Sequence, residues 1–291
     1  MLEIITSYTF IIVFLGTIML AISGSLVGSL NLFKGQSLIG DAIGHSSFPG
    51  IIISFMVFQS RNTLVLLTGA ALSGALSYYL IQKSSQHPKT SSDSNMVIFL
   101  TGFFGLGMVL KSFIQGNPSF SKSSQSGLDN YIFGQASYLL ESDLYIIFAI
   151  LLISLALILL FYKELKVYLF NPEYARVTGV PTKLIDFIIL FMTIIVISVG
   201  IKAVGSILIS SFLIMPTVFA LQWTNNFKGS LILGTVMASI SAFLGSLISS
   251  LGRGLSTGPS IILVSGLLTL FSIIFGKNSS LGKKLMRRRS K

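Results

Sequence analysis

The 291-residue sequence predicts an all-α protein, a polytopic transmembrane bundle of about eight or nine helices. Hydrophobic residues make up 52% of the chain and charged residues only 10%, whereas soluble domains carry about 25% charged residues. Apolar runs recur along the whole chain at close to the roughly 20 residues that span a bilayer. Lysine and arginine are concentrated in alternate loops, as expected when successive loops face opposite sides of a membrane.

Taken in order, the apolar segments predict the membrane-spanning helices. They cover residues 8–30, 45–60, 63–81, 96–115, 143–162, 184–201, 203–222, 229–250 and 258–276. Nine spans with a cytoplasmic C-terminus place the N-terminus outside, whereas eight spans with one re-entrant run place it inside. The sequence leaves both arrangements open, because the runs at 45–60 and 184–201 are short for a span.

The formal net charge of +11 mainly reports topology. Fifteen of the 20 lysines and arginines fall in segments that we place in the cytoplasm, among them the loop 163–183 and the chain from Lys277 onward. This is the positive-inside pattern, and it predicts contact with anionic lipid without requiring a nucleic-acid partner. We expect residues 1–276 to form the transmembrane domain and residues 277–291 a basic cytoplasmic tail.

The strongest functional signal is an acidic residue and a histidine within lipid-depth sequence. Asp41 and His45 are four residues apart, so on a helix they share one face. Ionisable residues at membrane depth are costly and usually face an interior path or a partner. A carboxylate beside an imidazole is a fitting pair of ligands for a divalent transition metal. The alternative is an intrahelical hydrogen bond between the two side chains that only fixes packing.

The polar loop 163–183 is patterned like a short helix. Asn171 can act as the N-cap and Pro172 as the first helical residue, and Gly179 can end the helix after Val177. A short helix in a cytoplasmic loop is either a docking element for another protein or an ordinary ordered loop.

Two features predict how the helices pack. Glycine pairs with three intervening residues at 24–28, 40–44 and 254–258 favour close helix contacts in lipid. Pro216 interrupts the run 203–222 and predicts a kink, which is either a gating hinge or a packing feature without a mechanical role.

Missing residues and motifs narrow the chemistry. The chain has no cysteine and two histidines, which argues against thiolate ligands and a closed structural zinc site. It also has no G-x-x-x-x-G-K-[ST] phosphate-binding loop and no H-E-x-x-H motif. If transport is driven by ATP, the ATPase must therefore be another chain, and this chain would be a transport subunit without its own ATPase site.

Five segments, in order along nearly the whole chain, resemble the integral-membrane permease of bacterial ATP-binding-cassette importers for manganese, zinc or iron. They are residues 38–50 (LIGDAIGHSSFPG), 131–136 (YIFGQA), 170–175 (FNPEYA) with Gly179, 204–208 (VGSIL) with 213–216 (LIMP) and Ala220, and 257–261 (TGPSI). Two positions depart from the family pattern: Gly44 stands where serine is common, and Asn171 stands where aspartate is common.

The resemblance implies a function and a set of partners. It implies a multi-pass subunit of the bacterial cytoplasmic membrane that moves a divalent metal ion past Asp41 and His45 without a permanently bound cofactor. Its partners would be two cytoplasmic ATPase subunits, a second permease chain (identical or paralogous) and an extracytoplasmic metal-binding protein. The segment that couples to the ATPase would comprise Asn171, Pro172, Glu173, Tyr174 and Ala175.

Other functions remain alternatives on the residues alone. A secondary, ion-coupled divalent cation transporter is the main rival, although it would need intramembrane acids besides Asp41. A purely structural membrane subunit has no need for Asp41 or His45, and an intramembrane enzyme needs a larger catalytic constellation. The sequence does not choose between manganese, zinc and iron, because an oxygen and a nitrogen ligand suit all three.

Overall fold

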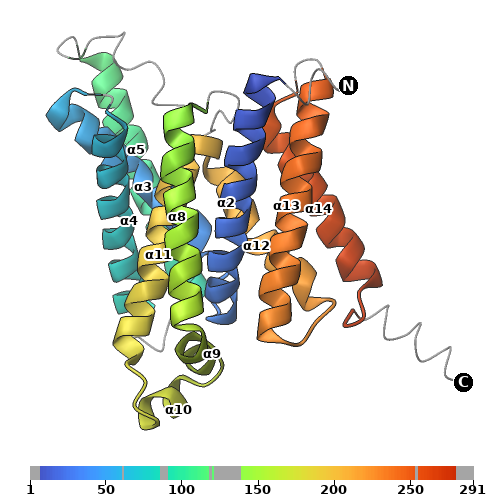
Figure 1. The fold of residues 1–291 in the computed structure, drawn as a ribbon. Coiled ribbons are helices and arrows are strands. Elements are labelled where there is room, and N and C mark those ends of the chain that lie inside the picture. The colour runs from blue at the N-terminus through green and yellow to red at the C-terminus, as the bar shows by residue number, and fades with distance from the viewer. Residues whose placement is uncertain are drawn as a thin grey trace, which may run out of the picture.

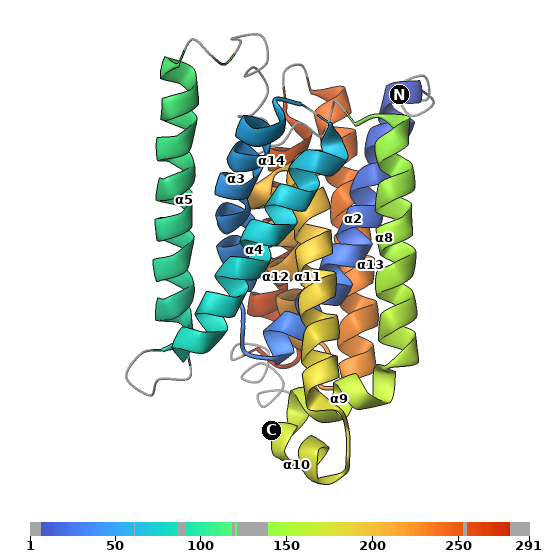
Figure 2. The same cartoon turned by 90° about the vertical axis from the view of Figure 1, so that its left-hand side faces the viewer.

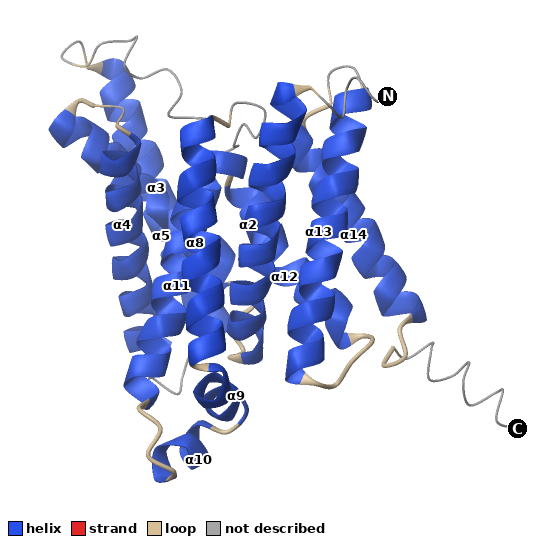
Figure 3. Ribbon diagram, viewed as in Figure 1, coloured by secondary structure: helices blue, strands red, loops and turns tan. Residues whose placement is uncertain are grey.

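Helices are the only regular elements in the parts of the chain that the computed structural model describes, residues 7–60, 62–85, 91–117, 120, 139–252 and 255–279 (Figures 1 and 3). This confirms the all-α bundle. In chain order the helices are α2 (Tyr8–Phe33), α3 (Ile39–Phe58), α4 (Thr63–Ser85), α5 (Ser92–Gly116), α8 (Glu141–Leu160), α9 (Tyr162–Phe170), α10 (Pro172–Val177), α11 (Thr182–Val204), α12 (Ser206–Leu221), α13 (Phe227–Leu251) and α14 (Thr257–Phe275).

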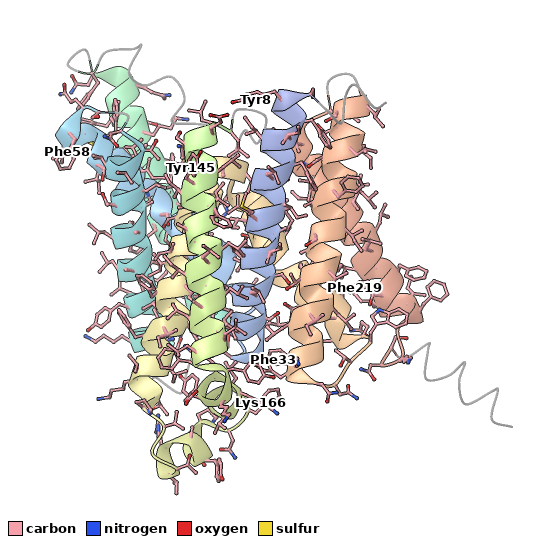
Figure 4. The ribbon with its side chains drawn as sticks, in the orientation of Figure 1. Tyr8, Phe33, Phe58, Tyr145, Lys166 and Phe219 are labelled. Carbon is pink, nitrogen blue, oxygen red and sulfur yellow. The ribbon has the colours of Figure 1, made fainter. Side chains whose placement is uncertain are left out.

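Eight of the described helices are long and apolar enough to cross a membrane, and α12 is a shorter apolar helix of 16 residues. Figure 4 places Tyr8 and Tyr145 at one end of the bundle and Phe33 and Lys166 at the other. We call the Lys166 end the inner end, because the loop predicted to be cytoplasmic lies there. The bundle starts at the outer end with α2 and finishes at the inner end with α14 (Figure 1). An odd number of passes favours the nine-span arrangement.

The shortest membrane helix is α12, and not either of the two runs that hydropathy indicated as short. The runs at 45–60 and 184–201 are parts of full-length helices, since α3 begins at Ile39 and α11 covers 23 residues. Polar and glycine residues at the start of α3 lower its local hydropathy without breaking the helix. The short helix is α12, which begins after Gly205, a residue with φ of 88° that glycine adopts readily.

The core is built from α2, α3, α11 and α12, and the other helices surround it. In the apolar stretch of α2 that could cross a membrane, 67% of the residues are buried, compared with 11% in the corresponding stretch of α5. Figure 2 shows α5 standing at one side of the bundle next to α3 and α4, while α8 and α13 lie at the other side. Helix α5 therefore covers one side of α3, the helix that carries Asp41 and His45, while most of α5 itself is left uncovered by the rest of the described chain.

Glycines on α2 and α3 let both helices approach α12 closely. A Cβ atom on Gly28 would lie 2.0 Å from the carbonyl oxygen of Leu213, and one on Gly24 would lie 2.8 Å from Cβ of Phe212. A Cβ atom on Gly40 would lie 2.7 Å from Cδ1 of Leu213. The predicted close contacts at 24–28 and at Gly40 are thus present, and both bear on α12.

The other predicted glycine contacts are looser or fall outside the described part. A Cβ atom on Gly44 would lie 3.8 Å from Cβ of Ser206, which is an ordinary contact. Gly254 lies outside the described residues, and a Cβ atom on Gly258 would come no closer than 3.8 Å to the backbone of Val204.

We predict that Gly28→Ala destabilises the bundle, because backbone atoms of α2 and α12 must separate to admit the methyl group. Overpacking of this kind costs about 1–3 kcal/mol or more. The measurement is thermal unfolding of the detergent-solubilised protein, together with its yield. Gly266→Ala in α14 is the matched control, since nothing lies within 4 Å of a Cβ atom there. Equal stability of the two variants would show that the α2–α12 contact is not tight.

Candidate functional site

The start of α3 carries the two candidate ligands. Asp41 lies in the first turn of the helix, where a negative charge also suits the helix dipole, and His45 follows one turn later. Both side chains are half-buried, while Ala42, Ile43 and Gly44 between them are buried. The helix therefore turns its apolar residues into the bundle and leaves the carboxylate and the imidazole on a partly open face.

His45 borders a small cavity made by four helices. Its ring meets Phe104 of α5 edge to face, with ring centroids 5.1 Å apart. Gly44 of α3, Ile201 of α11 and Ser206 at the start of α12 line the same cavity. Its volume of about 10 Å³ is roughly the room needed for one water molecule. No pattern in the sequence points to Phe104, whereas Ser206 belongs to one of the five motif segments.

The alternative of an Asp41–His45 hydrogen bond is not realised. Within the described residues, neither side chain makes a hydrogen bond or a close ion pair. No group of three or more histidine or acidic side chains in the described part is arranged to hold a metal ion. At this site the described residues thus offer one carboxylate and one imidazole, neither of them engaged by another described side chain, and they do not form a complete coordination shell.

The loop between α8 and α11 folds largely as its sequence predicts. The side-chain oxygen of Asn171 accepts a hydrogen bond of 2.9 Å from the backbone N–H of Tyr174, which caps α10, and Pro172 is the first helical residue. Gly179 has φ of 80° and ends the turn. The preceding helix α9 (Tyr162–Phe170) was not predicted, because its polar and apolar residues alternate too irregularly over nine residues.

The two short helices project beyond the inner end of the bundle and expose apolar side chains (Figure 1). Phe170, Tyr174 and Val177 are exposed, and Val177 is 86% accessible. Ala175 is fully buried, so it supports the shape of the loop and has no accessible surface of its own. Exposed aromatic and aliphatic residues on an ordered polar loop are typical of a surface that another protein covers.

Comparison with known proteins identifies the family to which the chain belongs. The ABC 3 transport family matches residues 7–276. The chain is 36% identical over 289 residues to the zinc transport system membrane protein TroC of Treponema pallidum, covering 99% of this chain and 96% of the relative. The chain belongs to the ABC 3 transport family. It is therefore a multi-pass membrane subunit of a transport system in the cytoplasmic membrane, as the resemblance implied.

Two further comparisons support this assignment. The chain is 35% identical over 272 residues to the manganese transport system membrane protein MntC of Bacillus subtilis, covering 94% of this chain and 62% of the relative. Among solved structures, a chain of PsaBC from Streptococcus pneumoniae in complex with Fab superposes with a TM-score of 0.82 at 25% identity, covering 97% and 99% of the two chains. Of the five motif segments, residues 131–136 lie outside the described part of this family member, as does the tail from 280 onward.

A partly buried polar network joins four helices at the inner end of this ABC 3 family member. Lys34, just after α2, pairs with Asp186 of α11 and donates a 2.8 Å hydrogen bond to the hydroxyl of Tyr78 in α4. The hydroxyl of Tyr168 in α9 donates to the same carboxylate at 3.2 Å. Burial opposes the charge of Lys34, but Tyr78 and Asp186 outweigh it and raise the pKa of Lys34 above its ordinary value. Helix α9, helix α11 and the segment that leads into α3 thus share one charged cluster.

A second ion pair lies at the outer end. Nζ of Lys202 is 2.5 Å from a carboxylate oxygen of Asp143 at the start of α8, and it donates a 3.1 Å hydrogen bond to Thr63 at the start of α4. Lys202 lies in the last turn of α11. Neither ion pair was predicted, because each joins residues far apart in the chain.

We predict that Asp186→Ala lowers the stability of the folded protein, because it leaves the ammonium group of Lys34 without its counter-charge. The pair is partly exposed, so a loss of about 1–3 kcal/mol is expected. Thermal unfolding in detergent measures it, with Asp93→Ala, at an exposed carboxylate in the first turn of α5, as the matched control. The double variant Lys34→Met/Asp186→Leu should recover most of the loss. An Asp186→Ala variant as stable as the control would rule out a stabilising role for the pair.

Proposed function

We propose that this chain is the permease subunit of an ATP-binding-cassette importer for a divalent transition-metal ion, and that Asp41 and His45 contact the ion as it crosses the membrane. The observation that carries the proposal is the available carboxylate and imidazole on one partly open face of α3. Lipid is a poor environment for both groups, so this face is suited to an ion path or a partner chain. The names of the relatives, zinc and manganese transport system membrane proteins, agree with the ligand chemistry.

The number of ligands supports pairing with a second permease chain. Transition-metal ions in proteins usually have four or more ligands, and the described part of this chain offers two at α3. A second permease chain with the same pair, identical or paralogous, would bring the number to four. Asp41 and His45 are only half-buried, so part of their face of α3 is left for such a partner, and an extracytoplasmic binding protein would deliver the ion at the outer end.

We assign ATP hydrolysis to separate cytoplasmic subunits that dock on the α9–α10 loop. The sequence lacks a phosphate-binding loop, and the exposed side chains of Phe170, Tyr174 and Val177 offer an apolar docking surface. Asn171 and Pro172 set the start of α10, Glu173 adds a charge beside the surface, and Ala175 supports it from inside.

Pro216 is our candidate hinge in α12. It has no N–H, so it leaves the carbonyl of Phe212 without its intrahelical hydrogen bond. Neighbouring hydroxyls supply polar contacts here: those of Ser29 and Thr217 are 2.8 Å apart. A helix weakened at this point can bend next to the glycine contacts with α2 and α3.

The structure offers little for the rival function of a secondary transporter. Coupling to protons or sodium needs further intramembrane carboxylates. Asp143 and Asp186 are both held by lysines, so neither is available for a cycle of ion binding and release.

We predict that Asp41→Asn and His45→Ala each lower metal uptake roughly tenfold or more while the protein still inserts and assembles. Asparagine keeps the shape of the side chain but removes the charge that attracts a dication, and even supporting residues of metal sites contribute 10- to 100-fold. Uptake of Mn²⁺, Zn²⁺ and Fe²⁺, each in competition with the other two, is measured in cells that carry or lack this chain. Asp93→Asn is the matched control. Normal uptake by both well-expressed variants would refute the site.

We also predict that Tyr174→Ala and Val177→Arg weaken binding of the ATPase subunit by roughly tenfold to hundredfold, the effect of losing about 1–3 kcal/mol at a packed contact. Pull-down of the ATPase subunit and metal-dependent growth are the two measurements. Tyr145→Ala is the matched control, because Tyr145 is also an exposed tyrosine but lies at the outer end of the bundle (Figure 4). If both variants match the control in both assays, the α9–α10 loop is not the docking element.

A further inference from the structure

A large apolar groove lies at the inner end on the side of the bundle away from α5. It has a volume of about 900 Å³, within the range of sites that take small molecules. Helices α8 and α13 form its walls, and α2 lies between them as its floor (Figure 1). Aliphatic side chains line most of it, including Leu26, Leu155, Ile158, Leu231, Ile232 and Val236.

The groove offers almost no polar surface along its length. Its one hydroxyl among the aliphatic residues, on Thr235, donates a 2.7 Å hydrogen bond to the carbonyl of Leu231 one turn earlier. A ligand in the groove would therefore meet only hydrocarbon there. Such a surface suits the acyl chains of a lipid.

The polar residues are gathered at the inner mouth of the groove. Lys163 at the start of α9 and Lys228 at the start of α13 are exposed, and within the described residues neither forms an ion pair or hydrogen bond. The hydroxyl of Tyr162 is likewise without a hydrogen-bond partner in that part of the chain. Glu164 also lines the mouth, so the four groups together carry a net charge of +1.

The placement of Lys228 is unfavourable for α13 alone. A cation in the first turn of a helix faces the positive end of the helix dipole, and α13 has no acidic residue there. The side chain of its N-cap residue, Asn226, makes no capping hydrogen bond. An anion at the mouth would interact favourably with both the lysine and the helix end.

A second copy of the chain is a poorer occupant of this groove. In a two-fold contact the same surface appears on both sides, so the mouth lysines of one copy would approach those of the other. The proposed metal site is on α3, close to α5, and Figure 2 shows α8 and α13 at the opposite side of the bundle. The groove is thus left facing lipid when a second permease chain covers α3.

We propose that this groove binds an anionic phospholipid of the cytoplasmic leaflet. Its acyl chains lie along α2 between α8 and α13, and its phosphate is held by Lys163, Lys228 and the hydroxyl of Tyr162. Basic groups next to apolar clefts on the cytoplasmic side are the known chemistry for recognising anionic headgroups. The proposal requires only that the chain is embedded in a membrane, so it stands or falls independently of the metal site.

The test compares two lipids with identical acyl chains, phosphatidylglycerol and phosphatidylcholine, binding to the purified full-length protein by native mass spectrometry. Wild-type protein should retain phosphatidylglycerol in preference to phosphatidylcholine. The double variant Lys163→Gln/Lys228→Gln should bind phosphatidylglycerol roughly 10- to 30-fold more weakly, with phosphatidylcholine unchanged, from the usual contribution of each lysine beside anionic lipid. Ile232→Trp should lower retention of both lipids by filling the groove.

The matched control is Lys166→Gln/Lys183→Gln, which removes two exposed lysines at the same end of the bundle but outside the groove. It should bind both lipids like wild type. The proposal is overturned if the two double variants lose equal affinity, or if the groove variant binds phosphatidylglycerol like wild type. It is also overturned if Ile232→Cys, in this cysteine-free chain, yields a disulfide-linked dimer in native membranes, because a second copy would then occupy the groove.

Discussion

The close approach of α2 and α3 to α12 is the constraint on which the rest of the bundle depends. Gly28 brings the backbone of α2 against that of α12, and Gly40 admits the side chain of Leu213 beside α3. In lipid there is little hydrophobic gain from pressing helices together, so such small residues supply the contact area that holds them. This packing places a short helix at the centre of the molecule and sets its first residue, Ser206, beside the cavity at His45.

A second consequence of the lipid environment is that many polar side chains find partners within the bundle, although six buried ones in the described part, among them Ser25 and Ser198, have none. Many serine and threonine hydroxyls donate to a carbonyl one turn earlier, as Ser47 does to Ile43. Lys34, which lies beside the inner end of α11, and Lys202, in the last turn of α11, each hold a carboxylate. Unlike these two cations, Asp41 and His45 receive neither a hydrogen bond nor a close ion pair from the described part of the chain. Groups that the fold leaves available at such depth are the ones on which an ion path can be built.

The sequence predicted local features well and long-range ones poorly. The cap at Asn171, the helix after Pro172 and the shared face of Asp41 and His45 follow from spacing over a few residues, and each is present. The beginning of α3 was placed too late, because hydropathy averages over the polar residues near Asp41 and hides a helix that continues through them. The pairing of Lys34 with Asp186 and the ring of Phe104 beside His45 depend on which helices become neighbours. No single-sequence pattern carries that information.

The two ion pairs also limit how the bundle can deform. Lys202 ties the outer end of α11 to α8, and Asp186 ties its inner end to the segment after α2. The two anchors are 16 residues apart, about 24 Å along the helix axis. A helix held by an ion pair near each end cannot move along its axis relative to its neighbours without breaking one of the pairs. Helix α11 is therefore expected to keep its position within the bundle. On the proposed ion path past His45, displacement would therefore fall to α3, which forms no ion pair within the described residues, and to the short helix α12 that it contacts.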